Sequence, residues 1–353
     1  MTTRTRCVLF LALAFGCGSE NIEAIGAEQP KVIDSNGIMI PCGPVLMICS
    51  ADEEAIRIFD WAKLGAPGRS PGLSTRMNVA FLDANTLALC PNDDATVSDE
   101  GRNRTLVVKR VHDGNEITRW ALGKEWYSSV MRGSRGGKYI AVALSEDLTF
   151  SHTGDNPSVR IGIIGPRPTD LQWIQTLTSD YFGHSRVEDL APSDDGNRIG
   201  VAGWRGRDLM IDVPSKTVLW TSEVRGTPVG IALTRDGGLA YATGGFDCTV
   251  YEFDGKNGKV LRKWAVEERY GYRMVSVAVS PDGRLVAAGT GPLGEVFVWS
   301  TKSGKMVMRL RHDERATVYN LAFSADSTKL ATGTGSWGAC AGKVIKIWIM
   351  PKD

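Results

Sequence analysis

Glycine spacing supplies the first motifs that could do chemistry. Gly289-Thr-Gly291-Pro-Leu-Gly294 and Gly333-Thr-Gly335-Ser-Trp-Gly338 both match the pattern G-x-G-x-x-G. In a dinucleotide site, such glycines connect a strand to a helix whose N-terminus binds pyrophosphate. Here an apolar run that indicates a strand follows each motif, and the two copies lie 44 residues apart. We therefore interpret them as a repeated loop between two strands and not as a nucleotide site.

The histidines and cysteines do not form a recognisable catalytic or metal motif. The chain has 4 histidines and 7 cysteines, and it lacks H-E-x-x-H, G-x-S-x-G, P-loop and C-x-x-C patterns. The acidic residues between 93 and 100 lack the alternating ligand spacing of a calcium loop. The sequence therefore predicts no catalytic residue, no metal ligand and no cofactor. Five cysteines are expected to pack as small apolar side chains, with a Cys42–Cys49 disulfide as the alternative: Cys42, Cys49, Cys90, Cys248 and Cys340.

A repeat of 40 to 50 residues organises the elements that would carry any site. Turns with a hydroxyl residue, an aspartate and usually a glycine begin at Ser193, Thr234, Ser280 and Ser324, at spacings of 41, 46 and 44 residues. Aspartate and glycine provide the side-chain caps and positive φ angles that tight turns need. Alternating apolar runs flank each turn, which predicts short antiparallel strands. Four such strands per repeat are typical of a β-propeller blade.

The residues of these repeats resemble the WD-repeat family. The resemblance is carried by Ser280-Pro-Asp-Gly283 with Trp299-Ser300 and by residues 245–254, with His184 and His312 where that family has its Gly-His pair. It is firm over about residues 183–349 and degenerate before them.

The resemblance also has departures. Only two copies keep the histidine, and the tryptophan of the third strand survives at Trp299 and Trp348. We therefore expect that no blade holds the complete hydrogen-bond network of histidine, serine or threonine, aspartate and tryptophan that the family implies.

Weaker copies toward the N-terminus bring the number of repeat starts to seven. The last copy ends near Met350 after three strands, and the resemblance implies that residues 30–34 lend it a fourth. The expected fold is all-β: a single seven-bladed β-propeller of four-stranded antiparallel blades, over residues 28–353, closed by an N-terminal strand. Trp120, Trp173, Trp220 and Trp264 fall in the predicted fourth strands, where packing between blades or on the outer wall is expected.

The family resemblance places two sets of loops on one face around the central channel. These loops precede first strands or follow second strands, and they are rich in tyrosine, tryptophan and arginine, the residue types enriched at binding hot spots. Half of these side chains are expected to line a partner-binding surface and the rest to cap blades. The candidates are Trp126, Tyr127, Arg186, Trp204, Arg205, Phe246, Tyr270, Tyr272, Arg273, Arg315 and Trp337.

Residues 1–27 are expected to be an export signal. Arg4 and Arg6 precede a short apolar run at residues 7–15, about half the length that a membrane-spanning helix needs. We therefore expect a periplasmic or extracellular protein without a transmembrane segment. Residues 14–17 loosely resemble a bacterial lipobox, so an alternative is a lipoprotein anchored through Cys17.

Charge and motifs together favour a binding protein. The net charge is +1, so no basic surface field indicates nucleic acid. The leading hypothesis is an exported, non-catalytic propeller that acts as a scaffold for a protein or peptide. The alternative is a propeller enzyme, a metal-assisted hydrolase or lactonase with its site in the channel, which would need converging acidic, amide or histidine side chains with shifted pKa values.

Overall fold

The computed structural model describes the chain in segments. These are residues 31–34, 37–42, 45–50, 55–60, 77–83, 85–91, 105–123, 126–146, 158–178, 181, 187–203, 207–222, 224, 229–266, 273–291, 293–312, 317–335 and 344–352. Side chains are described from Val79 onward, except those of residues 91, 127–129, 335 and 344.

The described strands form seven antiparallel sheets, and each sheet corresponds to one predicted blade. Blade 1 contains β2 (Gly37–Cys42), β3 (Val45–Ser50) and β4 (Ala55–Asp60). Blade 2 contains β5 (Met77–Asp83), β6 (Thr86–Pro91), β7 (Thr105–Arg110) and β8 (Glu116–Ala121). Blade 3 contains β9 (Tyr127–Gly133), β10 (Ile140–Ser145), β11 (Val159–Ile164) and β12 (Leu171–Leu177). The fourth strand expected in blade 1 would follow β4, at residues outside the described segments.

The remaining blades contain four strands each. They are blade 4, with β13 (Val187–Pro192), β14 (Arg198–Gly203), β15 (Asp208–Asp212) and β16 (Thr217–Thr221); blade 5, with β17 (Ile231–Leu233), β18 (Leu239–Thr243), β19 (Thr249–Asp254) and β20 (Val260–Ala265); blade 6, with β21 (Arg273–Val279), β22 (Leu285–Gly291), β23 (Glu295–Ser300) and β24 (Met306–Arg311); and blade 7, with β25 (Thr317–Phe323), β26 (Lys329–Gly335), β27 (Val344–Ile349) and β1 (Lys31–Asp34).

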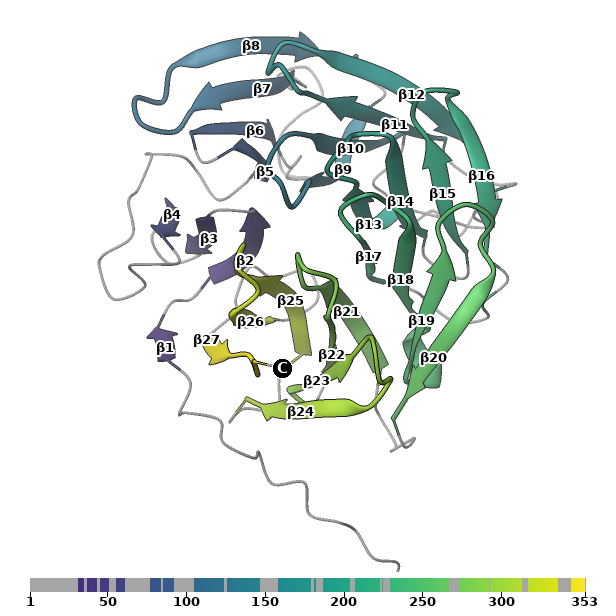
Figure 1. Ribbon diagram of the computed structural model, residues 1–353. Coiled ribbons are helices and arrows are strands. Elements are labelled where there is room, and N and C mark those ends of the chain that lie inside the picture. Colours follow the sequence, from purple (N-terminus) through teal and green to yellow (C-terminus); the bar gives the residue numbers. More distant parts are fainter. Residues whose placement is uncertain are drawn as a thin grey trace, which may run out of the picture.

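The first strands of the seven blades form a closed ring around the channel. Each contacts the first strand of the next blade, in the order β2, β5, β9, β13, β17, β21, β25 and back to β2. In Figure 1 the colours run around this ring from purple to yellow. Because every first strand leads into a turn at the same end, these turns lie together at one end of the channel, called here the turn end. The loops that enter first strands and those that follow second strands lie at the opposite end, the mouth.

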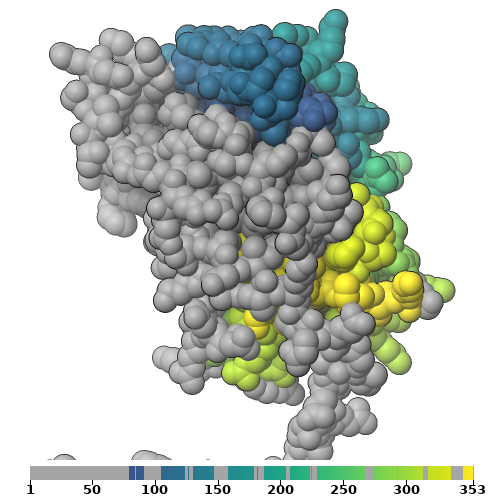
Figure 2. Space-filling view, turned by 90° about the vertical axis from the view of Figure 1, so that its left-hand side faces the viewer, coloured from purple at the N-terminus to yellow at the C-terminus, as the bar shows by residue number. Residues whose placement is uncertain are grey.

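The N-terminal strand closes the ring, as the sequence predicts. β1 pairs antiparallel with β27 over four residues, from Lys31 opposite Ile347 to Asp34 opposite Val344. The last blade therefore combines three strands from the C-terminal part of the chain with one from the N-terminal part. Figure 2 turns this side of the ring toward the viewer, with blade 2 in blue at the top and C-terminal residues in yellow at the lower right.

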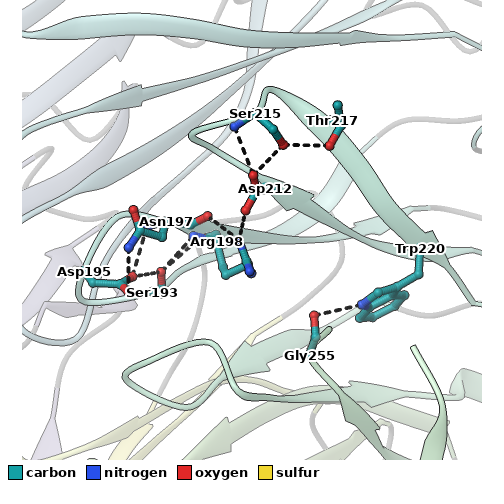
Figure 3. Close-up of polar contacts among 9 residues, drawn as sticks. All are labelled: Ser193, Asp195, Asn197, Arg198, Asp212, Ser215, Thr217, Trp220 and Gly255. Carbon is teal, nitrogen blue, oxygen red and sulfur yellow. Dashed lines mark hydrogen bonds and ion pairs between the residues drawn. The ribbon is translucent and has the colours of Figure 1, made fainter. Parts of the chain in front are cut away.

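The repeated turns have the structure that their sequence predicts. In blade 4, the Ser193 hydroxyl donates to Asp195 (2.6 Å) and accepts the Arg198 N–H (2.9 Å), while Gly196 has a φ of +73°. Figure 3 shows this turn. The same serine–aspartate bond forms in blades 6 and 7. In blade 7, the bond from Ser324 lowers the pKa of Asp326 to about 2. These local bonds fix the link between first and second strands.

Tryptophans of the fourth strands pack between blades. Trp220 of β16 donates its indole N–H to the Gly255 carbonyl of blade 5 (3.1 Å; Figure 3) and stacks on Phe253, with ring centroids 5.5 Å apart. Trp264 of β20 lies against Trp299 of blade 6, with ring centroids 6.4 Å apart. Small residues allow neighbouring blades to approach closely, since a Cβ at Gly289 would lie 2.5 Å from the Val318 carbonyl oxygen.

β-bulges recur at matching positions in the blades. Near the start of the first strand, the pairing register shifts by one residue in four blades, at Ser129, Glu188, Val275 and Tyr319. It also shifts in five fourth strands, at Ile117, Ile174, Leu219, Leu261 and Val307. An extra residue in one strand re-aims its side chain. The bulges in the first strands therefore change which side chains face the channel.

Candidate functional site

Three of the eleven candidate binding residues have described side chains. These are Trp126, Phe246 and Arg273. Tyr127 begins β9, and only its backbone is described. The other seven lie outside the described residues: Arg186, Trp204, Arg205, Tyr270, Tyr272, Arg315 and Trp337.

Phe246 is the exposed side chain of a fixed turn at the mouth. It lies in the 3-10 helix η3 (Gly245–Asp247), between the second and third strands of blade 5, and 55% of its surface is exposed. Asp247 accepts hydrogen bonds from the Thr249 N–H (3.0 Å) and the Tyr251 hydroxyl (2.5 Å). A Cβ at Gly244 would lie 2.1 Å from the Asp247 carboxylate, so this close turn requires glycine there. The loop thus holds an exposed aromatic ring on a rigid support.

Arg273 of blade 6 lies against the Phe246 ring of blade 5. Its guanidinium carbon is 4.0 Å from the ring centroid, the distance of a cation–π contact. Arg273 is the first residue of β21, and β21 contacts η3. The structure therefore brings together two of the candidate residues predicted from the sequence.

Trp126 has a different role. The Arg160 guanidinium carbon lies 6.0 Å from the Trp126 ring centroid and 4.1 Å from that of Trp173. Trp126 also packs against the hydrophobic core shared by blades 2 and 3. Its described contacts are therefore structural, and none of them joins it to Phe246 or Arg273.

Two further residues at the mouth were missed by sequence analysis. Glu188 of β13 and Tyr319 of β25 both occupy first-strand bulges. Burial raises the pKa of Tyr319, Glu188 raises it further, and Arg273 opposes the shift. Arg273 and Glu188 therefore both lie within electrostatic reach of Tyr319. One sequence signal was available: the run at residues 318–323 is one residue longer than its counterparts at 229–233 and 275–279.

The buried Tyr319 hydroxyl has no hydrogen-bond partner among the described residues. The Thr317 side chain lies beside the phenol and lowers the pKa of Tyr319. A buried hydroxyl without a partner loses the hydrogen bonds that water would make, at a cost of about 1–3 kcal/mol. The mouth thus contains a donor that an incoming ligand could satisfy.

The turn end of the channel is crossed by a side chain. Arg135 of blade 3 donates to the Val279 carbonyl of blade 6, which lies nearly opposite in the ring. Burial lowers the pKa of Arg135 to about 10, against the opposing effect of Asp194. Asp194 also accepts the Gly136 N–H (2.5 Å) and a bond from Arg235 (2.7 Å), which connects blades 3, 4 and 5.

The channel wall between the two ends carries a charge pair that holds strands together. Arg132 of β9 donates to Asp189 of β13 at 2.7 Å. Asp189 also accepts the backbone N–H groups of Leu190 (3.0 Å) and Ile231 (3.3 Å). Burial raises the pKa of Asp189, and Arg132 opposes the shift. Both carboxylate oxygens are engaged by the protein, so their evident role is to link blades 3, 4 and 5.

Blade 7 contains three members of the network that the family resemblance implies. The His312 ring shares a hydrogen bond of 2.7 Å with Thr332, and the Trp348 indole N–H donates to the same hydroxyl at 2.9 Å. All three side chains are buried. The chain therefore retains a histidine–threonine–tryptophan network that connects the loop entering blade 7 to its second and third strands.

Two further kinds of site, a metal centre and a membrane-spanning helix, can be assessed in the described residues. Among them, no three or more histidine, cysteine, aspartate or glutamate side chains gather closely enough to hold a metal ion. In the same segments, no helix is both long and apolar enough to span a membrane.

Comparisons with known proteins agree with this architecture. Residues 304–348 match the family model of the WD domain, G-beta repeat, and this segment contains the network of blade 7. Over 72 residues, the chain is 35% identical to the Periodic tryptophan protein 2 homolog of Schizosaccharomyces pombe, a match that covers 20% of this chain and 8% of that protein. The fold is similar to the β-propeller domain of Myceliophteria thermophila Cps50 (Swd1), with a TM-score of 0.66, 15% identity, and coverage of 92% of this chain and 100% of the other.

Proposed function

We propose that this chain, a WD-repeat β-propeller, is a non-catalytic scaffold that captures a protein or peptide partner at the channel mouth. WD-repeat propellers commonly serve as scaffolds for protein interactions. The observation that carries the proposal is the contact between Phe246 and Arg273, which joins blades 5 and 6 at the mouth.

The energetics of this pair support a binding role. Exposure of a large aromatic ring to water is unfavourable, and burying such a ring in a partner contributes strongly to binding. Because the bonds of Asp247 fix the turn, Phe246 loses little conformational entropy when a partner arrives. Arginine and aromatic residues of this kind dominate the binding energy of many interfaces.

The channel carboxylates support the non-catalytic proposal. A catalytic acid or base needs access to substrate. Asp189 has a raised pKa, but Arg132 and two backbone N–H groups already occupy its oxygens. A structural link between strands accounts for this perturbed group.

A double variant tests the binding face. Phe246→Ala with Arg273→Ala should reduce capture of partners from a native extract by about 30-fold, since an anchor residue is typically worth ~2 kcal/mol or more. The midpoint of thermal unfolding should change little, because loop substitutions usually shift stability by about 0.5 kcal/mol or less. Quantitative mass spectrometry of the captured proteins and scanning calorimetry would measure the two effects.

The control removes one exposed apolar side chain and one arginine away from the mouth. Leu261, on an outer strand, and Arg167, in an exposed turn, are suitable, so Leu261→Ala with Arg167→Ala should capture partners normally. Unfolding of the test variant would make Phe246 and Arg273 structural caps. Normal capture by the folded variant would place the binding face elsewhere, such as the insertions at residues 91–103 and 145–158.

We also propose that the protein is exported. The support is the sequence of residues 1–27, with two arginines before a short apolar run. Fusion of residues 1–30 to a reporter should direct it out of the cytoplasm. Cys17→Ser should leave export unchanged, and it should abolish lipid labelling if Cys17 carries an anchor. A reporter that stays in the cytoplasm would contradict the proposal.

A further inference from the structure

Arg273 differs from most arginines of the propeller in what its guanidinium contacts. In the described segments, nine other arginines pair with carboxylates of their own or a neighbouring blade: Arg110, Arg119, Arg132, Arg167, Arg198, Arg235, Arg262, Arg284 and Arg309. Within the described residues, the partner of Arg273 is the Phe246 ring, and no carboxylate pairs with it. The stacking holds the guanidinium plane against the ring and leaves its N–H donors available at the edges.

A second unsatisfied donor lies in the same place. The hydroxyl of Tyr319 is buried without a partner in the described structure, and Arg273 is within electrostatic reach of it. The pKa of Tyr319 is raised by burial, so the phenol keeps its proton and remains a donor at neutral pH. Arg273 and Tyr319 thus both offer hydrogen-bond donors in the part of the mouth that the structure describes.

The chemistry of these groups selects one kind of ligand. A carboxylate accepts two parallel hydrogen bonds from a guanidinium and can accept another from a phenol. Glu188 lies close enough to Tyr319 to raise its pKa, so this part of the mouth already contains one carboxylate. A single carboxylate fits this balance better than a doubly charged phosphate. The exposed Phe246 ring offers an apolar surface beside it.

We propose that Phe246, Arg273 and Tyr319 form a receptor for one peptide carboxylate next to an apolar side chain. This inference rests on the proposed function, because it assigns the chemistry of the partner at the same mouth. The carboxylate can come from an aspartate or glutamate side chain or from a peptide C-terminus, and the test separates these sources.

The experiment selects ligands from two synthetic libraries of random eight-residue peptides on the immobilised full-length protein. One library has amidated C-termini and the other has free C-termini. Enrichment of acidic residues beside apolar ones in the amidated library would indicate a side-chain carboxylate. Enrichment of peptides with free C-termini, without a preference for acidic side chains, would indicate a C-terminal carboxylate. Both results support the inference.

Variants then test the assigned residues with the best selected peptide and its neutral counterpart. The neutral counterpart replaces the acid with its amide. The wild-type protein should bind the acidic peptide at least 10-fold more tightly, and Arg273→Gln should abolish this preference. Tyr319→Phe should weaken binding of the acidic peptide by about 10-fold, the loss expected when a hydrogen bond to a charged group is removed. Arg167→Gln is the control and should keep the full preference.

The outcomes distinguish the two proposals. One outcome is that the peptides selected by the wild-type protein no longer bind the Phe246→Ala variant, yet carry no preferred carboxylate. The mouth would then be the binding face, and the carboxylate inference would be wrong. If selection on the wild-type protein yields the same peptides as selection on Phe246→Ala, both proposals are wrong. Retention of the preference in folded Arg273→Gln would also overturn the assignment.

Discussion

Removal of residues 28–36 is expected to lower the midpoint of thermal unfolding by about 10 °C or more. The deletion removes β1 and the four residue pairs that it makes with β27. Each lost backbone hydrogen bond contributes about 0.5–1.5 kcal/mol. In a large domain, 1 kcal/mol corresponds to about 2–4 °C. Blade 7 would retain only the three strands of the C-terminal part of the chain.

Calorimetry of two versions of the protein, beginning at residue 28 and at residue 37, measures this effect. A synthetic peptide of residues 28–36, added in excess, should restore part of the lost stability to the shorter version, because it can occupy the position of β1. A peptide with the same residues in scrambled order is the control and should have no effect. Equal melting of the two versions would show that β1 contributes nothing to closure.

Substitution of Asp208 is expected to change how stability depends on pH. Asp208 begins β15 and is fully buried. Its Oδ2 lies 3.4 Å from the Ser222 hydroxyl, while its Oδ1 has no partner in the described part of the protein. Burial raises the pKa of Asp208 to about 8, and the Ser222 hydrogen bond only partly opposes the shift.

The sign of the effect follows from proton binding. In the unfolded chain an aspartate titrates near ~3.9, so between about pH 4 and pH 8 the folded state holds a proton that the unfolded state has lost. The contribution of Asp208 therefore lowers the free energy of unfolding by about 1.4 kcal/mol for each unit that the pH rises in this range. Asp208→Asn has the same shape and cannot ionise. It should remove this slope and gain on the order of 4 kcal/mol relative to the wild-type protein between pH 5 and pH 8.

Urea unfolding from pH 5 to pH 8 would measure both proteins. Asp326→Asn is the matched control, since the pKa of Asp326 is lowered to about 2 and its contribution to stability is lost only below about pH 4. The control should therefore keep the wild-type slope over the measured range. A wild-type protein whose stability is independent of pH in this range would show that Asp208 is ionised in the folded state.

The blades and their closure could be predicted because their signals are local. The serine–aspartate turns and alternating apolar runs define each strand pair within a few residues, and the incomplete last repeat requires a strand from elsewhere. The described part of the chain confirms these predictions down to the pairing of Lys31–Asp34 with β27. Trp220 and Trp264 also pack between blades, as predicted from their positions in fourth strands.

The binding site was less accessible to sequence reasoning because it depends on distances between blades. The sequence placed Phe246 and Arg273 on one face, but their contact requires the relative position of two blades. Glu188 and Tyr319 were missed because each occupies a bulge, where one extra residue changes the face that a side chain reaches. Trp126 shares its residue type with binding aromatics, yet its described contacts with Arg160 and the core are structural.

The bulges in the fourth strands have a consequence for solubility. A propeller presents the outer edge of every blade to solvent, and a straight exposed edge is a template for pairing with another chain and for aggregation. Five outer strands carry the bulge at matching positions, from Ile117 in blade 2 to Val307 in blade 6. Each bulge interrupts the ladder and bends the strand, so a second molecule cannot continue the sheet in register. The five bulges should therefore limit edge-to-edge pairing between propeller molecules at high protein concentration.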